Sequence, residues 1–241
     1  MIDWHCHILP GLDDGPSTPE EAIEIAVALR AAGFTRVYCT PHLIRRRYET
    51  DNAAVIEGVA QLQTRLDALR IELALFPGRE YYLDEYLSDY LKDPLPLGES
   101  RYLLIEIPDH SLPALVIDAF GGVLRTGYIP LIAHPERCRF FEPAVRNGLP
   151  GFSSISSLFG GKKPKPGTTN SPSGTTTLLD TLRAMGCKFQ GDLGSFAGLY
   201  GERVKKNALW LKSAGIYDCF GTDAHAAFET RYWGNPVKID F

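Results

Sequence analysis

The chain has 241 residues, of which 44% are hydrophobic and 22% are charged, as in an ordinary globular protein. This length allows one large α/β domain or two small ones, and the apolar content is ample for a core. The formal net charge is −4, so no basic surface argues for nucleic acid as a partner. No apolar stretch approaches the roughly 18 residues of a membrane span.

The cysteines and the first residues of the chain predict a cytoplasmic protein. There are five cysteines, an odd number without a CxxC pair, which favours free thiols in a reducing compartment. The opening sequence MIDWH lacks the basic and apolar regions of a signal peptide.

Short apolar runs alternate with helical patterns along the chain. We predict strands at 2–7, 36–40, 73–78, 102–107, 129–133, 188–193 and 218–222. We predict helices at 18–32, 52–69, 84–92, 112–126, 178–185 and 201–213. This alternation indicates a mostly parallel sheet, either open or closed into a barrel.

Polar residues stand at the carboxyl ends of successive predicted strands. In chain order they are His42, Glu80, Glu106, His134, Asp223 and His225. In a (β/α) barrel this is the face where the active site is built, whereas an open sheet would place its ligand mainly at one switch point. The distribution therefore favours a barrel.

One segment, at about 148–177, breaks this pattern. It is rich in Gly, Ser, Thr, Lys and Pro and has no sustained apolar period. Such a composition buries too little surface to order itself independently. We therefore expect one domain over residues 1–241 that carries a mobile loop insert, in place of two domains.

The histidines of the chain indicate a metal site. His5 and His7 lie two residues apart on the first strand, so both imidazoles face one side and can grip a single ion. Either histidine alone could be an ordinary core or surface residue. The full candidate set is His5, His7, Asp14, His42, Glu80, Glu106, His134, Asp223 and His225. Five imidazoles and four carboxylates exceed the needs of one ion, so two or three ions bridged by carboxylate are predicted, with Mn, Fe or Zn suited to mixed N/O ligands.

Several motifs resemble, in the same order, those of the PHP (polymerase and histidinol phosphatase) superfamily. They are HCHILPGLDDGP from His5, TPH ending at His42, GREYY around Glu80, LIEI around Glu106, IAHPER around His134 and TDAH ending at His225. The opening motif is especially similar to that of the CpsB/YwqE-type protein-tyrosine phosphatases of bacterial capsule and exopolysaccharide systems. The resemblance covers nearly the whole chain apart from the insert.

This resemblance implies a distorted (β/α)7 TIM-like barrel with a trinuclear metal centre built from the nine candidate ligands. It implies metal-dependent hydrolysis of phosphate monoesters, with a tyrosine kinase of polysaccharide biosynthesis as the phosphotyrosine substrate. Arg137 resembles the family's phosphate-binding arginine. Arg231, after the last Asp-x-His, is either a second phosphate ligand or a surface ion-pair partner. Oligomers occur in the family, but the sequence carries no assembly signal.

Two alternatives remain open. The chain could be a phosphoesterase for a small metabolite such as histidinol phosphate. It could also be a non-catalytic regulatory module that retains a metal site. Finally, the spacing of Cys39 and Arg45 imitates a cysteine-dependent phosphatase loop, but that run lacks a glycine for the turn and Pro41 removes a phosphate-binding amide. We interpret this last match as coincidence.

Overall fold

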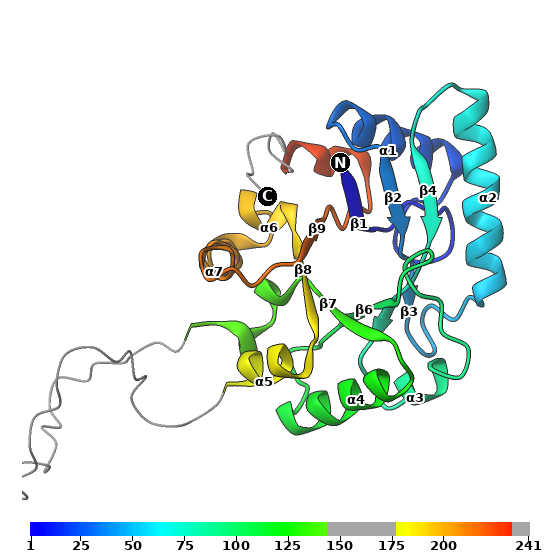
Figure 1. Cartoon of the computed structure of the whole chain (residues 1–241). Helices are drawn as coiled ribbons and strands as arrows, with labels where there is room; N and C mark the ends of the chain where they lie inside the picture. Colours follow the sequence, from blue (N-terminus) through cyan, green and yellow to red (C-terminus); the bar gives the residue numbers. More distant parts are fainter. Residues whose placement is uncertain (144–176, 233–241) are drawn as a thin grey trace, which may run out of the picture.

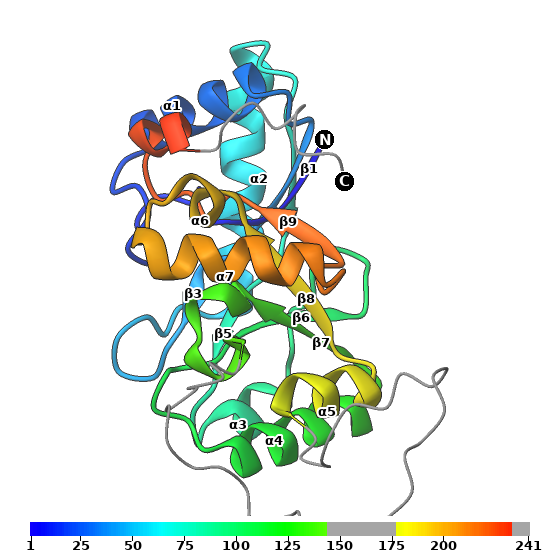
Figure 2. The same ribbon diagram turned by 90° about the vertical axis from the view of Figure 1, so that its left-hand side faces the viewer.

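The structure is a computed structural model that describes residues 1–143 and 177–232 (Figure 1). Within these ranges strands and helices alternate, and the helices surround the strands on the outside (Figures 1 and 2). The insert predicted at about 148–177 lies outside the described residues, except for Thr177. The Thr177 hydroxyl accepts a hydrogen bond from the Asp180 backbone N–H at the start of the next helix.

All strand pairs in the described residues are parallel. The strands are β1 (Ile2–Cys6), β2 (Arg36–Cys39), β3 (His42–Leu43), β4 (Ala74–Pro77), β5 (Glu80–Tyr82), β6 (Tyr102–Glu106), β7 (Ile129–Ala133), β8 (Lys188–Asp192) and β9 (Cys219–Gly221). One sheet has the order β1-β2-β4, and the other has the order β3-β5-β6-β7-β8-β9.

Two short interruptions link these sheets. The chain passes from β2 to β3 through Thr40 and Pro41, where proline has no N–H to donate to a strand ladder. It passes from β4 to β5 through Gly78, where a Cβ atom would lie 2.6 Å from Leu97 Cδ2. Because β2 neighbours β4 and β3 neighbours β5, both sheets share these two interrupted strands.

The last strand returns to the first. The Asp223 N–H donates to the His5 carbonyl over 2.7 Å, and the His7 N–H donates to the Ala224 carbonyl over 3.0 Å. Gly221 permits this approach, since a Cβ there would lie 2.6 Å from the His5 Cβ. With the interrupted strands counted once each, seven strand positions close on themselves. The predicted distorted (β/α)7 barrel is confirmed.

Helices cover the outer faces of both sheets. They are α1 (Pro19–Ala31), α2 (Asn52–Ala68), α3 (Leu87–Tyr90), α4 (Pro113–Arg125), α5 (Leu178–Met185), α6 (Leu193–Ala197) and α7 (Gly201–Ser213), with 3-10 turns η1 (Pro135–Arg137), η2 (Arg139–Phe141) and η3 (Ala227–Tyr232). No described helix is both long enough and apolar enough to span a bilayer.

Alternating side chains on the strands separate the helix-facing core from the site-facing interior. On β6, Leu103 and Ile105 pack in the same buried cluster as Phe120 of α4. Leu104, between them, belongs to a separate cluster with Leu131 of β7. Glu106 follows Leu104 on the same face of the strand. An apolar layer thus lies beneath the polar ends of the strands.

The predicted elements agree with the structure apart from a few short segments. The two-residue β3 and three-residue β5 were not predicted, because each resumes a strand after an interruption. Helix α3 is shorter than the predicted 84–92, since Asp84 Oδ1 accepts the Tyr86 N–H and holds a turn there. The short helix α6 was also missed; Asp192 Oδ1 accepts the Gly194 N–H and begins it.

Candidate metal centre

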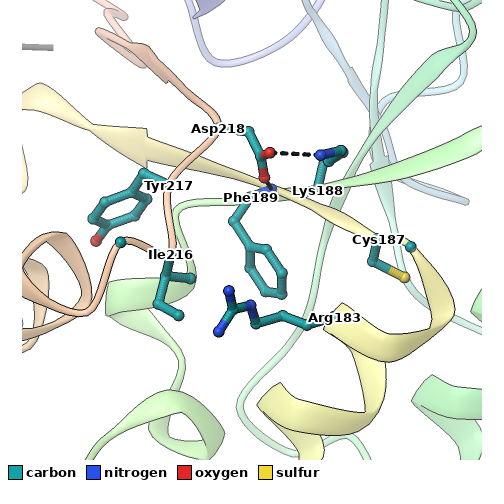
Figure 3. Close-up of a pocket in the computed structure, with 9 residues that line it drawn as sticks. Arg183, Cys187, Lys188, Phe189, Ile216, Tyr217 and Asp218 are labelled. Atoms are coloured by element: carbon teal, nitrogen blue, oxygen red, sulfur yellow. Dashed lines mark hydrogen bonds and ion pairs between the residues drawn. The ribbon is translucent and has the colours of Figure 1, made fainter.

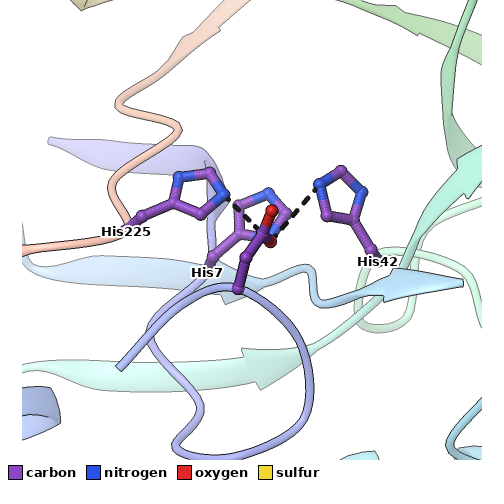
Figure 4. Close-up of side chains that lie close together, drawn as sticks. His7, His42 and His225 are labelled. Carbon is purple, nitrogen blue, oxygen red and sulfur yellow. Dashed lines mark ion pairs between the residues drawn. The ribbon is translucent and has the colours of Figure 1, made fainter. Parts of the chain in front are cut away.

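Eight of the nine candidate ligands form three overlapping groups at the carboxyl ends of the strands. Within each group the ligand atoms lie within 4.8 Å of one another. The groups are His7, Asp14, His42 and His225; His5, His7, Glu80 and Asp223; and His42, Glu80 and Glu106. Figure 4 shows the rings of His7, His42 and His225 turned toward one another.

The ninth candidate, His134, lies against the same cluster. Its Nε2 atom is 3.0 Å from Glu80 Oε1. His134 follows β7 with φ at +29°, a backbone conformation that is unusual for a residue with a Cβ. The structure therefore brings all nine predicted residues into one region.

The innermost group has the spacing of a metal coordination shell. The Nε2 atoms of His5 and His7 are 2.9 Å apart, and each lies 3.1 Å from Asp223 Oδ1. Glu80 Oε2 lies 3.2 Å from the first nitrogen and 3.3 Å from the second. An ion with bonds of about 2.0–2.2 Å holds neighbouring ligand atoms about 3 Å apart. These four buried side chains therefore fit a divalent ion.

Glu80 lies where the groups meet. Its Oε2 atom is buried and is also 3.0 Å from His42 Nδ1, yet it accepts no well-oriented hydrogen bond among the described residues. An orphaned buried carboxylate oxygen is costly unless a cation satisfies it. With Oε1 facing His134 and Oε2 facing three other imidazoles, this carboxylate has the position of a bridging ligand.

Acceptor oxygens orient three of the imidazoles from behind. His5 Nδ1 lies 3.0 Å from Gln190 Oε1, and His7 Nδ1 lies 2.7 Å from Asp13 Oδ2. His225 Nδ1 lies 2.8 Å from the Asp223 carbonyl oxygen. An acceptor at Nδ1 places the proton there and leaves the Nε2 lone pair free to bind a metal. All three Nε2 atoms face the cluster.

The charges in the cluster suit cations. Burial lowers the pKa of His5, but the carboxylates of Glu80 and Asp223 outweigh it and raise that pKa to about 9. Burial raises the pKa of Glu80, yet His5 and His42 hold it well below its usual range. The pKa of Glu106 is raised by its burial and by the charge of Glu80. The carboxylates thus favour positive charge at this position, whether protons or metal ions supply it.

Arg137 lies beside the cluster, in η1. Its Nη2 donates to Asp192 Oδ2 and to Asp223 Oδ2, both over 2.6 Å, and its guanidinium covers the Tyr200 ring at 3.7 Å. Its buried Nε has no hydrogen-bond partner among the described residues. The guanidinium is therefore fixed next to a candidate ligand, and one of its donors is left unpaired.

Three polar residues of this site were missed from the sequence. Gln190 and Asp192 lie on β8, where polar residues at alternate positions repeat the signal that identified His5 and His7. Asp13 precedes the predicted ligand Asp14 in the opening motif, but only the folded loop turns it toward the back of His7.

Two other predictions concern Arg231 and the cysteine loop. The side chain of Arg231, in η3, lies outside the described residues. Cys39 is buried in β2, and burial raises the pKa of its thiol well above the usual range. A buried thiol of high pKa is a poor nucleophile, which agrees with the interpretation of that motif as coincidence.

A separate cleft of about 220 Å³ opens at the start of β8 and β9 (Figure 3). Arg183, Phe189 and Ile216 contribute to its lining, and Lys188 Nζ pairs with Asp218 Oδ1 over 2.8 Å. The amino ends of barrel strands serve stability, whereas catalytic groups gather at the carboxyl ends. This cleft therefore lies at the end of the barrel opposite the candidate ligands.

Comparisons with known proteins agree with the geometry. Residues 1–146 match the family model described as capsular polysaccharide synthesis, CpsB/CapC. The chain is 34% identical over 227 residues to tyrosine-protein phosphatase YwqE of Bacillus subtilis. This alignment covers 93% of this chain and 77% of YwqE. In three dimensions it is similar to the crystal structures of YwqE from Bacillus subtilis and CpsB from Streptococcus pneumoniae, metal-dependent tyrosine phosphatases. That match has a TM-score of 0.78 and 30% identity and covers 100% of this chain and 87% of the other.

A more distant likeness supports the fold alone. Histidinol phosphate phosphatase from Lactococcus lactis aligns with a TM-score of 0.53 at 12% identity, over 96% of this chain and 90% of that enzyme. The predicted family resemblance is thus confirmed by sequence and by structure. The chain belongs to the CpsB/CapC family of capsular polysaccharide synthesis.

Proposed function

We propose that the protein is a metal-dependent phosphatase that hydrolyses phosphotyrosine in proteins, with a tyrosine kinase of capsular or exopolysaccharide biosynthesis as its target. The observation that carries this proposal is the buried set of His5, His7, Glu80 and Asp223. Its two imidazole nitrogens lie 2.9 Å from each other and 3.1–3.3 Å from the carboxylate oxygens. The relatives named above are tyrosine phosphatases, which supports the choice of substrate class.

The proposed centre holds two or three divalent ions. The nine ligands are His5, His7, Asp14, His42, Glu80, Glu106, His134, Asp223 and His225. Their mixture of imidazole nitrogen and carboxylate oxygen suits Mn first, with Fe and Zn as alternatives. Three overlapping groups that share His7, His42 and Glu80 support more than one ion.

When bound, such ions supply a nucleophile at neutral pH and offset the charge of the phosphate. The chain's own contribution is to bind and orient the ester. Asp192 and Asp223 hold the Arg137 guanidinium beside the cluster, where it is proposed to bind a phosphate oxygen. A tyrosine phenol has a pKa of about 10, so it leaves with little proton donation from the protein. Arg231 is proposed as a second phosphate ligand on its sequence position alone.

The proposed location is the cytoplasm. All five cysteines are free, and Cys6 and Cys39 face each other as register partners on β1 and β2 without a disulfide. Neighbouring free thiols suit a reducing compartment.

The test is hydrolysis of a phosphotyrosine peptide and of histidinol phosphate by the purified protein with Mn. We expect the peptide to be preferred, EDTA to abolish turnover and Mn to restore it. His5→Ala is expected to remove both bound metal and activity, whereas His110→Ala, at an exposed position, is expected to keep both. Turnover that resists the chelator, or metal binding without hydrolysis of any phosphate ester, would overturn the proposal.

A further inference from the structure

Three consecutive arginines occupy the turn that leads from β3 to α2. Ile44 and Tyr48 pair with each other through hydrogen bonds of 2.9 and 2.8 Å, so Arg45, Arg46 and Arg47 form the tip of a tight turn. All three arginines are exposed. The loop that contains them projects from the body of the protein beside β3 (Figure 2, light blue).

Aromatic stacking ties this turn to the metal centre. The Tyr48 ring lies nearly parallel to the ring of the candidate ligand His42, with an interplanar angle of 10° and centroids 5.9 Å apart. The Arg47 guanidinium in turn lies 5.0 Å from the centre of the Tyr48 ring. Arg47 and Tyr48 thus connect the turn to the candidate ligand His42 through two stacked contacts.

A buried arginine holds the other end of the loop. Arg79, between β4 and β5, is fully buried; its Nε donates to Asn52 Oδ1 over 2.8 Å and its Nη2 donates to the Thr50 carbonyl. Asn52 is the first residue of α2. The loop is therefore anchored at Tyr48 and again at Thr50 and Asn52, so its tip has a defined position relative to the barrel.

Two of the three cations have no acidic partner among the described residues. Arg45 Nε lies 3.3 Å from Glu49 Oε1, and its guanidinium covers the Tyr86 ring at 4.6 Å. No carboxylate in residues 1–143 or 177–232 pairs with Arg46 or Arg47. Arg46 also has φ at +62°, a conformation that disfavours side chains with a Cβ. The fold thus presents two uncompensated guanidinium groups beside the site of a chain whose net charge is −4.

We infer that the Arg46–Arg47 tip is a docking element for anionic side chains that flank the target phosphotyrosine in the substrate protein. This inference rests on the proposed phosphatase function. The two stacking distances of 5.9 and 5.0 Å set an upper limit on the span from the His42 ring to the Arg47 guanidinium. An extended peptide advances about 3.3 Å per residue and covers that span in about three residues. The anionic group is a carboxylate or a second phosphate within about three residues of the scissile one. Arginine binds either group through paired N–H donors.

The surroundings favour a peptide over a membrane as the partner. Recognition of anionic lipid typically uses clusters of four to eight basic residues. At this turn, two cations lack a carboxylate partner within the described part of the chain, and the protein is acidic overall. Their place beside His42 brings them within reach of whatever chain enters the site.

The experiment compares phosphotyrosine peptides that carry Glu, a second phosphotyrosine, Ala or Lys at the flanking positions. The variant is Arg46→Ala/Arg47→Ala. The matched control is Arg125→Ala/Arg183→Ala, which removes the same charge from exposed positions on α4 and α5. Binding is measured with peptides that carry a non-hydrolysable phosphonate, and turnover is measured with the phosphopeptides and with p-nitrophenyl phosphate. The binding measurement separates a failure of docking from a failure of catalysis.

We expect the wild type to prefer the Glu peptide or the doubly phosphorylated peptide over the Ala and Lys peptides by about 10-fold at low salt, with a smaller ratio at high salt. The ratio is expected to vanish in the tip variant and to persist in the control, while p-nitrophenyl phosphate hydrolysis stays unchanged in both. A preference for the Glu peptide identifies the anionic group as a carboxylate, and a preference for the doubly phosphorylated peptide identifies it as a phosphate. The inference is overturned if the tip variant keeps the wild-type ratio. It is also overturned if the wild type does not prefer the anionic peptides over the Ala and Lys peptides. A third contrary result would be tip mutations that weaken sedimentation with phosphatidylserine vesicles and leave peptide binding intact.

Discussion

His7 Nδ1 lies 2.7 Å from Asp13 Oδ2, and both side chains are inaccessible to water. Burial raises the pKa of Asp13, but its pairing with His7 outweighs this effect and lowers that pKa below its usual value. Asp13 therefore acts from behind the metal cluster. Its neighbour in the sequence, Asp14, faces the front, with Oδ1 3.4 Å from His225 Nε2.

We expect Asp13→Asn to weaken metal binding by about 10- to 100-fold, as is usual for the outer partner of a ligand histidine. Asn can still accept the Gly15 N–H, which Asp13 Oδ1 accepts over 2.9 Å, but an amide no longer offers His7 a charged acceptor. Titration with Mn, followed by competition with a chelator, measures the change. Asp118→Asn, on the exposed face of α4, serves as the control. Equal affinities in the two variants would show that Asp13 only shapes the loop.

Glu80→Gln is expected to lower the number of bound ions as well as the rate. Glu80 contributes both carboxylate oxygens to the cluster, whereas a glutamine offers one oxygen and one N–H donor group that faces the imidazoles. The loss of activity should exceed the 10- to 100-fold typical of outer partners. Elemental analysis of the purified variant gives the stoichiometry, and Glu24→Gln on the surface of α1 gives the reference. Full metal content in Glu80→Gln would contradict its bridging position.

Arg137→Lys is expected to reduce kcat/KM by about 10- to 100-fold with bound metal unchanged. A lysine keeps the charge, but one ammonium group cannot bind Asp192 and Asp223 and also reach a phosphate oxygen in the geometry of a guanidinium. The inhibition constant of inorganic phosphate should rise together with KM. The adjacent exposed Arg139→Lys should behave as the wild type. A variant that loses metal instead would assign Arg137 to holding Asp223.

Asp3 predicts a pH dependence of stability. Burial raises its pKa to about 7, while the hydrogen bonds from Thr222 and His5 lower it. Because the folded pKa lies above the unfolded value, the native state binds more protons between about pH 4 and 7. The contribution of Asp3 to stability is therefore present at low pH and is lost as the pH rises through this window.

In Asp3→Asn this dependence should disappear, since the amide carries no charge and its oxygen can still accept from the Thr222 N–H. The quantity to measure is the free energy of unfolding in urea, for both proteins in EDTA, from pH 4 to 7. We expect the free energy of unfolding of the variant to rise relative to that of the wild type as the pH rises, by up to about 1.4 kcal/mol for each pH unit. A difference that stays constant with pH would show that Asp3 is ionised throughout.

Much of the fold was predictable because most strands and most helices carry their own signal. The β7 strand (Ile129–Ala133) and the helices α5 and α7 match their predicted bounds, since apolar period and end signals are local properties of the chain. The resumed strands β3 and β5 were not predictable in this way. Two or three residues hold no period, and these strands exist only because a neighbouring strand pairs with them.

The sequence alone predicted which residues could bind metal, because most of these His, Asp and Glu residues stand at the ends of apolar runs whose carboxyl ends meet in a parallel barrel. Only the tertiary structure decided which of those residues lie next to one another and on which side of the cluster each one lies. Closure of β9 onto β1 brings Asp223 to His5, and the fold turns Asp13 behind His7 and leaves Asp14 in front. It also sets Gln190 and Asp192 beside partners far away in the sequence. The physical reason is that side-chain chemistry belongs to each residue, whereas distance and orientation arise only when strands that are remote in the chain pack together.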